Sequence, residues 1–344
     1  MYTIRARNVN DAFVEGMRLL RAEGDNQPSR DGPVRALPMP MTTVYERPWE
    51  RVLFSPIRDA NPFFHLFESM WMLAGSDDGV WLDRYVRDFS SRFGEPSSGS
   101  IWGAYGHRWR RTFELTGARM GTDSYPEWES DQLDRAVRLL RANPTSRQVV
   151  VSMWDPTMDL GTVARDRPCN THIYLRIREG ALDTTVCCRS NDMVMGAYGA
   201  NAVHMSVLHE YLAARIGCPM GTYYQVSNDM HAYQRDLDRY VGHVWSRRDT
   251  NNAYETGLVD HRDLFSGGDM STLDREIAAW VARPDECPVN NNPQLFEELL
   301  IPMHTAHTLH KQGSSGSALD VLEMVTHSDW KLAAQLWINR RTRS

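Results

Sequence analysis

The segment from Thr171 to Arg189 limits the possible folds more than any other part of the chain. Residues 171–178 alternate between apolar and polar side chains, as a half-buried strand does. Glu179 and Gly180 then form a turn, and residues 182–189 return as a second strand. A hairpin centred near Glu179 pairs residues whose numbers sum to about 358. Cys169 and Arg189 are therefore expected side by side at its open end.

Apolar spacing predicts helices before and after this hairpin. Asn10 to Glu23 has helical periodicity, with Asn10 as N-cap and Gly24 just past the end. The apolar helix Asn61 to Leu73 carries one carboxylate, Glu68. Further expected elements are a polar loop over 25–40, a strand over 148–153, a helix over 202–216 and mainly helical structure toward the C-terminus. Helices combined with separate antiparallel strands indicate an α+β fold.

The composition is that of an ordinary globular protein. The chain has 344 residues, 42% of them hydrophobic and 24% charged, and a formal net charge of -6. This acidic balance argues against broad nucleic-acid binding, although a local arginine cluster can still bind a phosphate. We find neither a signal peptide nor a membrane-spanning run, and expect a cytoplasmic protein without a membrane partner. The cysteines form no metal-binding spacing, which predicts reduced thiols and no metal: Cys169, Cys187, Cys188, Cys218 and Cys287.

The residues near the hairpin end have both a chemical and a purely structural interpretation. A thiolate is a nucleophile, and a guanidinium beside it should lower the pKa of Cys169 toward physiological pH. On spacing alone, buried packing is the simpler interpretation of this cysteine. Arg189 and Ser190 suit a phosphate, although Arg189 could instead form a surface ion pair. His231 and Tyr233 lie on one side of an extended chain, which suits a sugar hydroxyl, although a structural histidine fits as well.

Several short segments, in order along the chain, resemble the active-site signature of the thymidylate synthase family. They lie between about Arg30 and Tyr233, and so many ordered matches are a specific signature. The resemblance implies a thymidylate synthase-like fold, with a mixed sheet packed with helices over residues 1–245 and a helical extension packed on it over residues 246–344. The segments are Asn61-Pro62-Phe63-Phe64-His65 with Glu68 and Trp71, Tyr105-Gly106 with Trp109-Arg110, Ser146-Arg147, Pro168-Cys169, Arg189-Ser190-x-Asp192, Gly196, Asn201 and His231-x-Tyr233.

The resemblance also implies a reaction and a role for each residue. Cys169 would add to C6 of a pyrimidine nucleotide, making C5 a nucleophile toward the one-carbon unit of 5,10-methylenetetrahydrofolate. Glu68, its pKa raised by apolar surroundings, would organise proton transfers, and Tyr105 would help to remove the C5 proton. Arg147 would reach the phosphate from a second subunit, which implies an obligate homodimer. The other expected nucleotide ligands are Arg30, Arg189 and Ser190 at the 5′-phosphate, Asp192 and Asn201 at the base, and His231 and Tyr233 at the ribose.

Three departures from the family pattern favour water over hydride as the group that completes the reaction. Asn170 follows Cys169 where the methylating enzymes have histidine, and Gln148 replaces the second arginine of the family's pair. Phe89 and Phe93 occupy the region in which a tryptophan of those enzymes shields the methylene intermediate from water. The chain also continues past the point where the family's short apolar tail ends. This pattern resembles the hydroxymethylase branch more closely.

One side chain reads the base in this family. An amide suits uracil, since it donates to O4 and accepts from N3–H, whereas a carboxylate accepts from the amine of cytosine. Counting forward from Arg189 on the family spacing reaches Ala200, which can read neither base. Counting back from His231 reaches Asn201. The 196–200 loop is therefore expected to carry one extra residue, with Asn201 as the reader and dUMP as the substrate.

Several alternatives stay open at this point. If Trp81 or Trp102 supplied the missing aromatic cover, the chain would be a thymidylate synthase that methylates dUMP. A hydroxymethylase acting on dCMP or CMP is a second alternative. A third is a non-catalytic relative that binds nucleotide or RNA, against which the intact nucleophile and Glu68 argue. DNA binding through the basic end Arg340 to Arg343 is a fourth, although such a run is more typical of a solvated tail.

Overall fold

The computed structural model describes residues 1–113, 131–240, 252–286 and 290–342. The predicted domain boundary at residues 245 and 246, together with Cys287 and Arg343, lies outside the described residues. Helices and two sheets share the described part, which confirms the expected α+β class. None of the helices described combines the length and the apolar character that a bilayer crossing requires.

A six-stranded sheet forms the centre of the molecule. Its β1–β4 and β7–β9 pairs are parallel and its other pairs are antiparallel, so the sheet is mixed, as the resemblance predicts. The strand expected over 148–153 is shorter than predicted. In spatial order the strands are β1 (Tyr2–Ala6), β4 (Met41–Tyr45), β9 (Met220–Ser227), β7 (Ala181–Cys188), β6 (Asn170–Arg178) and β5 (Val150–Ser152).

The two faces of this sheet are covered very differently. One row of registered neighbours is fully buried, at 0% exposure: Val151, Ile173, Val186, Gln225 and Thr43. The helix α8 (Asn201–Ile216) packs against β7 and β9. Side chains in a strand alternate between faces, and the adjacent positions Val150 and Tyr174 are 45% and 46% exposed. The second face of the sheet is therefore open.

The predicted hairpin is present with a small difference in register. Glu179 and Gly180 have φ angles of 50° and 81°, which gives the two-residue turn that fits the twist of paired strands. Along most of the hairpin the paired numbers sum to one more than predicted, as with Ile173 and Val186. A β-bulge between Asn170 and His172 inserts one residue and shifts the register by one.

A second, smaller sheet replaces much of the loop predicted over residues 25–40. Three-residue strands in this segment pair with each other, and the second of them pairs with β10. That expectation was wrong because each strand has only three residues, too few to show an apolar alternation, and β2 is entirely polar. The sheet order is β2 (Asp25–Gln27), β3 (Val34–Ala36), β10 (Met230–Tyr233) and β8 (Asn191–Asp192).

The helices predicted before the hairpin are present, and only one N-cap differs from the prediction. In α1 (Val9–Glu23) the N-cap is Asn8, whose side chain accepts from the amides of residues 10 and 11. Asn10 lies inside the helix instead, where its amide donates to the carbonyl of Val52. In α2 (Pro62–Leu73), Asn61 accepts from the amide of Phe64. The shorter helices are α3 (Gly79–Leu82), α4 (Phe89–Phe93), α5 (Tyr105–Arg110), α6 (Gln132–Ala142), α7 (Pro156–Asp159) and α9 (Gln234–Tyr240).

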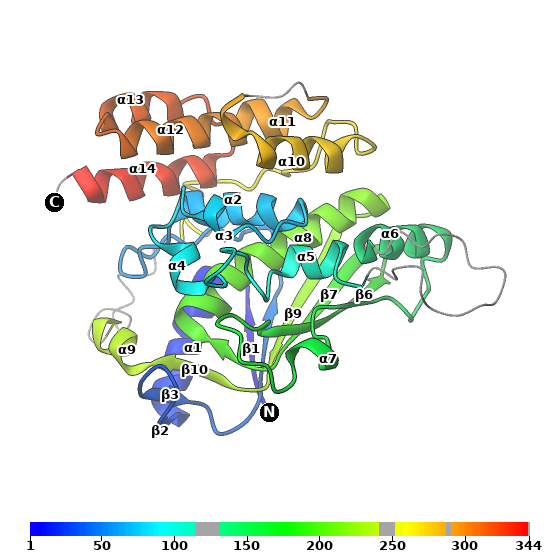
Figure 1. Ribbon diagram of the computed structural model, residues 1–344, viewed down its shortest axis with the longest axis vertical. Coiled ribbons are helices and arrows are strands. Elements are labelled where there is room, and N and C mark those ends of the chain that lie inside the picture. Colours follow the sequence, from blue (N-terminus) through cyan, green and yellow to red (C-terminus); the bar gives the residue numbers. More distant parts are fainter. Residues whose placement is uncertain (114–130, 241–251, 287–289, 343–344) are drawn as a thin grey trace.

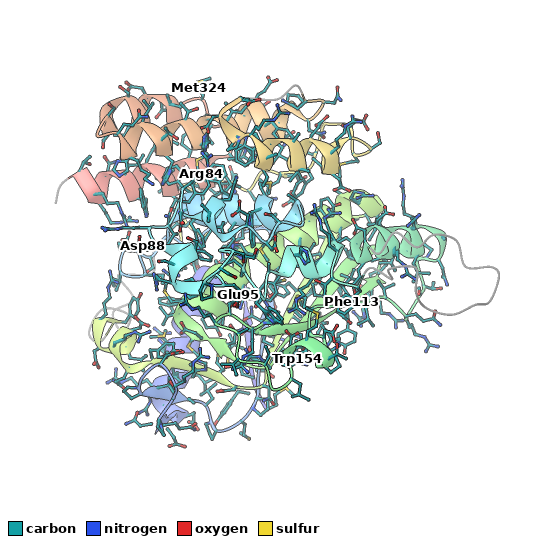
Figure 2. The ribbon with its side chains drawn as sticks, viewed as in Figure 1. Arg84, Asp88, Glu95, Phe113, Trp154 and Met324 are labelled. Carbon is teal, nitrogen blue, oxygen red and sulfur yellow. The ribbon has the colours of Figure 1, made fainter. Side chains whose placement is uncertain are left out.

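The C-terminal part forms a helical layer over α2, on the side of α2 away from the sheet (Figure 1). Phe67 of α2 stacks on Trp280 at 5.3 Å, and Phe63 meets Trp337 edge to face at 5.4 Å. Arg84 forms an ion pair of 3.0 Å with Asp285 at this junction (Figure 2). The layer consists of α10 (Leu273–Ala282), α11 (Pro293–Leu295), α12 (Ile301–Lys311), α13 (Ser315–Leu322) and α14 (Ser328–Thr342).

Candidate active site

Cys169 and Arg189 lie next to each other at the open end of the hairpin, as predicted. The Arg189 amide donates to the carbonyl of Cys169 at 2.8 Å. Its guanidinium Nη2 lies 3.7 Å from the Cys169 sulfur. The same guanidinium donates to the carbonyls of Arg167 and Pro168 and lies 5.7 Å from the ring centre of Trp154. These contacts fix the cation beside the thiol.

The pKa of Cys169 differs from the sequence expectation. Burial raises the pKa of the thiol above its ordinary value. Arg189 and Arg30 oppose this shift, while the carboxylates of Asp166 and Asp192 add to it. The expectation that the neighbouring cation would bring the pKa down to physiological values was therefore wrong for this structure, because burial and nearby carboxylates outweigh the arginines.

Tyr105, the first residue of α5, is bound directly to the backbone of the thiol segment. Its hydroxyl oxygen accepts from the amides of Cys169 at 3.1 Å and Asn170 at 3.2 Å. Burial, followed by the proximity of Cys169, raises the pKa of this phenol well above its ordinary value. The phenol therefore stays protonated, and its hydrogen is free to point away from the two amides that it accepts from.

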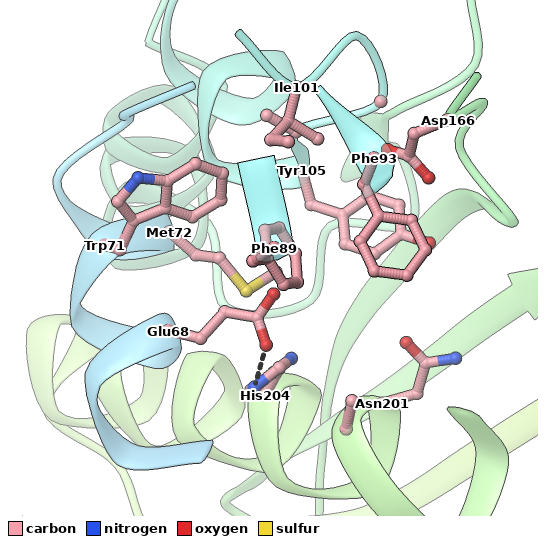
Figure 3. A pocket seen from close by; sticks show the side chains of 13 residues that line it. Glu68, Trp71, Met72, Phe89, Phe93, Ile101, Tyr105, Asp166, Asn201 and His204 are labelled. Carbon is pink, nitrogen blue, oxygen red and sulfur yellow. Dashed lines mark ion pairs between the residues drawn. The ribbon is translucent and has the colours of Figure 1, made fainter. Parts of the chain in front are cut away.

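A cavity of about 180 Å³ lies beside Tyr105. Its wall is largely apolar, and Figure 3 shows the Glu68 carboxyl and the His204 ring pointing toward each other at one side of it. Aromatic side chains of α2 and α4 form another side. The lining residues are Glu68, Trp71, Met72, Phe89, Phe93, Ile101, Gly103, Ala104, Tyr105, Asp166, Ala200, Asn201 and His204.

Glu68 is a protonated carboxyl at neutral pH. Burial, followed by the nearby Asp166 carboxylate, raises its pKa to about 8. This agrees with the expected effect of the apolar helix around it. The carboxyl oxygen Oε2 lies 3.2 Å from Nε2 of His204, an α8 residue.

Asp166 and His204 are site residues that the sequence analysis missed. Asp166 precedes Cys169 by three positions in a loop that carries no recognisable pattern. His204 lies three residues after Asn201, on the helix that was predicted correctly. Helical spacing places residues three apart on one face, so His204 was open to identification once Asn201 was assigned.

The expected phosphate and sugar ligands lie around the thiol. Arg30 lies in the β2–β3 connection, pairs with Asp31 at 3.0 Å, and is close enough for its charge to act on Cys169 and Tyr233. His231 and Tyr233 project from the same side of β10, as predicted, with ring centres 5.7 Å apart. The Ser190 hydroxyl bonds to the carboxylate of Asp229, which also lies 3.6 Å from Nδ1 of His231.

Asp192, which was expected to contact the base, also caps a helical segment. Its two carboxylate oxygens accept from the amides of Val194 and Met195 and so cap the π-helical segment η1 (Met193–Ala200). A π-helical turn contains more residues than an α-helical one, so it accommodates the extra residue predicted for the 196–200 loop. The backbone of Tyr198 and Gly199 departs from helical angles, and α8 then begins at Asn201.

A chain of buried amides holds Asn201. Its side-chain oxygen accepts from Nδ2 of Asn170 at 3.1 Å, and its nitrogen donates to the side-chain oxygen of Asn191 at 3.0 Å. Asn191 donates in turn to the hydroxyl of Ser227 at 3.1 Å. Each bond fixes the direction of the next, so the oxygen and the nitrogen of Asn201 have defined places at the edge of the cavity.

Three other expected residues lie away from this site. Arg147 is exposed and precedes β5 at the sheet edge, and no contact with the Cys169 region is seen among the described residues. The indole of Trp81 donates to the carbonyl of Val281 in the C-terminal layer. The indole of Trp102 donates to Asp159. Neither tryptophan lines the cavity in the part of the chain that is described, so neither supplies the aromatic cover considered above.

One group of side chains elsewhere has the types that bind a metal. Glu210, His261 and Asp263 have potential ligand atoms within 4.8 Å of one another. The Glu210 carboxylate, however, already accepts from the guanidinium of Arg51 and from the amide of Leu264. These protein donors satisfy its charge, so the group needs no metal to explain it.

Comparison with known proteins gives consistent matches. The family model described as thymidylate synthase matches residues 58–258. A deoxyuridylate hydroxymethyltransferase of Pseudomonas phage M6 is 40% identical, with 99% of this chain and 95% of the relative covered. The enzyme of the same name from Bacillus phage SP01 is 30% identical over 69% of this chain and 60% of its own length. A putative thymidylate synthase of Methanosarcina acetivorans is 27% identical over 68% of this chain and 91% of its own.

Proposed function

Because the chain belongs to the thymidylate synthase family, we propose that it transfers a hydroxymethyl group to C5 of dUMP, using 5,10-methylenetetrahydrofolate and water. The position of the Cys169 thiol carries this proposal. The sulfur lies 3.7 Å from Arg189 Nη2. The backbone amide of Cys169 donates to the hydroxyl of Tyr105, and Tyr105 lines the same cavity as Glu68. A nucleophile, a cation for a phosphate and a protonated carboxyl thus border one space. The names of the two phage relatives support both the hydroxymethyl product and the uracil base.

The nucleotide would bind with its phosphate at the arginines and its base toward the cavity. Arg189 has fork donors beyond those used on backbone carbonyls, and Arg30 adds a second positive charge near the thiol. His231 and Tyr233 would contact the ribose. This pose brings C6 to Cys169, whose sulfur attacks while protonated Glu68 supplies a hydrogen bond on the far side of the base.

The cavity wall suits the ring system of a folate. Trp71, Phe89 and Phe93 offer flat aromatic surface and Ile101 adds an aliphatic contact. Glu68 and Asp166 offer polar atoms at the edge. When bound, the folate supplies the one-carbon unit that C5 attacks. Tyr105, fixed on the Cys169 and Asn170 amides, is placed to assist removal of the C5 proton. Loss of the thiolate from C6 then restores the aromatic base.

Water rather than hydride would capture the methylene intermediate. Trp71, Phe89 and Phe93 line the cavity, but neither Trp81 nor Trp102 adds further cover among the described residues. The buried carboxyl of Glu68 and the ring of His204 lie on the same cavity wall and can bond to a water molecule there. Product analysis with dUMP, dCMP and CMP tests this directly: hydroxymethyl-dUMP supports it, while thymidylate formed together with dihydrofolate contradicts it.

Replacing the base reader should change the substrate. Asn201→Asp removes the donor for uracil O4 and creates an acceptor for the cytosine amine, so the ratio of kcat/KM for dCMP over dUMP should rise about 10- to 100-fold. Steady-state kinetics with both nucleotides measure this ratio. Asn228→Asp makes the same chemical change at an exposed position and is the matched control. An unchanged ratio in the Asn201 variant would remove this residue from base recognition.

The open face of the large sheet supports the proposed homodimer. Val150 and Tyr174 are registered neighbours near the sheet edge, and both are nearly half exposed. The face continues through Thr185 and Tyr224, which are only partly buried. A second copy covering this apolar and polar surface would bury it and bring its own Arg147 toward the phosphate site.

Mixed dimers test the contribution of Arg147. Cys169→Ser and Arg147→Ala homodimers should both be weak enzymes, because each lacks one part of every site. After unfolding and refolding together they should recover about one quarter of wild-type activity, since half the dimers are mixed and each has one intact site. Recovery shows as turnover at low dUMP concentration. Mixtures no better than the two homodimers would mean that Arg147 acts within its own subunit.

Residues 246–344 are proposed to be an extension that braces the catalytic part. Its described helices bury the aromatic residues Trp280 and Trp337 against α2, the helix that carries Glu68. Tyr85, next to α2, bonds to His304 at 2.8 Å. The extension therefore supports the helix that positions the acid, without lining the cavity itself in the part of the chain that is described.

A further inference from the structure

Two buried polar atoms that lie close to each other on the cavity wall have no hydrogen-bond partner in the described chain. They are Oε2 of Glu68 and Nε2 of His204, 3.2 Å apart. The two side chains are 15% and 3% exposed. Buried polar atoms are almost always bonded, so an unpaired carboxylate oxygen facing an unpaired imidazole nitrogen calls for an explanation.

A single proton between the two atoms removes the conflict. The His204 ring bonds through its other side to the backbone of His65, which leaves Nε2 as the nitrogen with a free lone pair. Burial lowers the pKa of His204 to about 3, and burial raises that of Glu68 to about 8. At neutral pH the carboxyl is therefore the protonated partner, and it can donate to Nε2.

The charged and titratable groups around the pair favour this neutral form. Asp166 faces Glu68 across the cavity and disfavours a second carboxylate there. His65 packs edge to face on His204 at 6.0 Å, and burial lowers its own pKa well below the ordinary value. The positive charge of Arg58 acts on His65 and also lowers its pKa. Within the described ranges, Glu68 is the carboxylate that faces Nε2 of His204.

We propose that His204 is the positioning residue of Glu68 for the capture of water, an inference that rests on the proposed function. In the resting state its Nε2 accepts a hydrogen bond from Oε2 of Glu68. This bond orients the carboxyl so that its second oxygen faces the cavity as an acceptor. His204 is a residue of α8, three positions after Asn201, and its side chain lines the cavity. A purely structural role would not explain this position in the cavity wall.

The proton balance of the step follows from this arrangement. The water oxygen forms a bond to the exocyclic carbon, and one of its O–H bonds breaks. The proton moves to the free oxygen of Glu68, while the proton on Oε2 passes to Nε2 of His204. The displaced electron pair enters the pyrimidine ring, and this negative charge stabilises the imidazolium. The ring then expels the Cys169 thiolate from C6, and the proton taken from water leaves Glu68 for this thiolate. The proton on Nε2 of His204 returns to Oε2 of Glu68, which restores the resting pair.

The resting pair can be tested in the wild-type protein without substrate. Nitrogen-15 NMR should show His204 as a neutral ring protonated on Nδ1 between about pH 5 and pH 7. The infrared carbonyl band of a protonated carboxyl, assigned with Glu68→Gln, should disappear with a midpoint near the Glu68 pKa of about 8. A His204 imidazolium near neutral pH, or an ionised Glu68 at pH 6, would overturn the proposal.

Variants then connect the pair to the reaction. His204→Gln places an amide donor beside Glu68, so the carboxyl midpoint should fall by at least about one pH unit. Hydroxymethyl product should fall about 10- to 100-fold relative to tritium released from C5 of the nucleotide. His204→Asn, which is too short to reach Glu68, should show the same uncoupling if His204→Gln fails to fold.

The control is His209→Gln, which also replaces a buried histidine of α8. His209 bonds to the carbonyl of Leu182 and lies outside the cavity lining. It should leave both the carboxyl midpoint and the product-to-tritium ratio unchanged. Equal ratios in the His204 variants and in wild type would overturn the role of His204. If wild type releases tritium but forms no hydroxymethyl product, the proposed function fails while the spectroscopic test of the pair still stands.

Discussion

Replacing Cys169 by serine should lower turnover by at least about 1,000-fold, because a hydroxyl is a far weaker nucleophile than a thiol at neutral pH. The loss should appear in kcat rather than in nucleotide affinity, since Arg189 keeps its bonds to the carbonyls of Arg167 and Pro168. Stopped assays of product formation and equilibrium binding of dUMP separate the two quantities.

The matched control is Cys218→Ser. Cys218 is half-buried at the end of α8, far along the chain from the site, and is not part of the cavity. It should retain wild-type turnover within about twofold. A Cys169→Ser enzyme that still works at the wild-type rate would exclude Cys169 as the covalent nucleophile.

Replacing Glu68 by glutamine should have opposite effects on activity and on stability. Activity should fall by about 100- to 10,000-fold, the range typical for loss of a general acid or base. The amide keeps the shape of the protonated carboxyl and still donates to His204, so folding should be preserved.

The stability effect should depend on pH in a defined direction. The Glu68 pKa is about 8 in the folded state against an ordinary value of 4.5, so the folded state holds a proton that the unfolded state releases. Wild type therefore loses stability as pH rises from about 4.5 to about 8, by up to about 5 kcal/mol. The glutamine variant does not titrate, so its advantage in unfolding free energy should grow over this interval and stay constant below it.

Denaturant unfolding at several pH values, at one fixed protein concentration, measures this difference. The mutation Gln132→Glu is unsuitable as a control, because the amide of Gln132 donates to two backbone carbonyls. Glu297→Gln, on the surface of the C-terminal layer, should give a difference that does not change with pH. A flat difference for Glu68→Gln would mean that this carboxyl is ionised at neutral pH and is not the acid of the site.

The hairpin shows how far the sequence alone can position a site. The alternation of residues 171–178 and the Glu179-Gly180 turn defined both strands. The register along most of the hairpin was nevertheless off by one. The bulge near Asn170 corrected the difference at the open end, so Cys169 and Arg189 are neighbours as expected. A bulge leaves no clear mark in a single sequence, since one strand only gains an unpaired residue.

Other differences have similar physical causes. The strands β2 and β3 were missed because pairing defines them rather than a long apolar pattern of their own. β3 pairs with β10, a partner about 200 residues away, and β2 pairs with β3. As residue types, Asn8 and Asn10 are equally good N-caps. Which of them caps the helix depends on Val52, a residue of a distant loop, because the Asn10 side chain donates to the Val52 carbonyl. The pKa of Cys169 was misjudged because burial and the position of Asp166 depend on the packed cavity.

The origin of the oxygen in the product tests the central claim, that water completes the reaction, most directly. Turnover of dUMP in water enriched in oxygen-18, followed by mass spectrometry, should give hydroxymethyl-dUMP that carries the heavy oxygen in its new hydroxyl group, with the folate released as tetrahydrofolate. Unlabelled thymidylate accompanied by dihydrofolate would contradict the claim, because it would mean that hydride from the folate, and not water, captures the methylene.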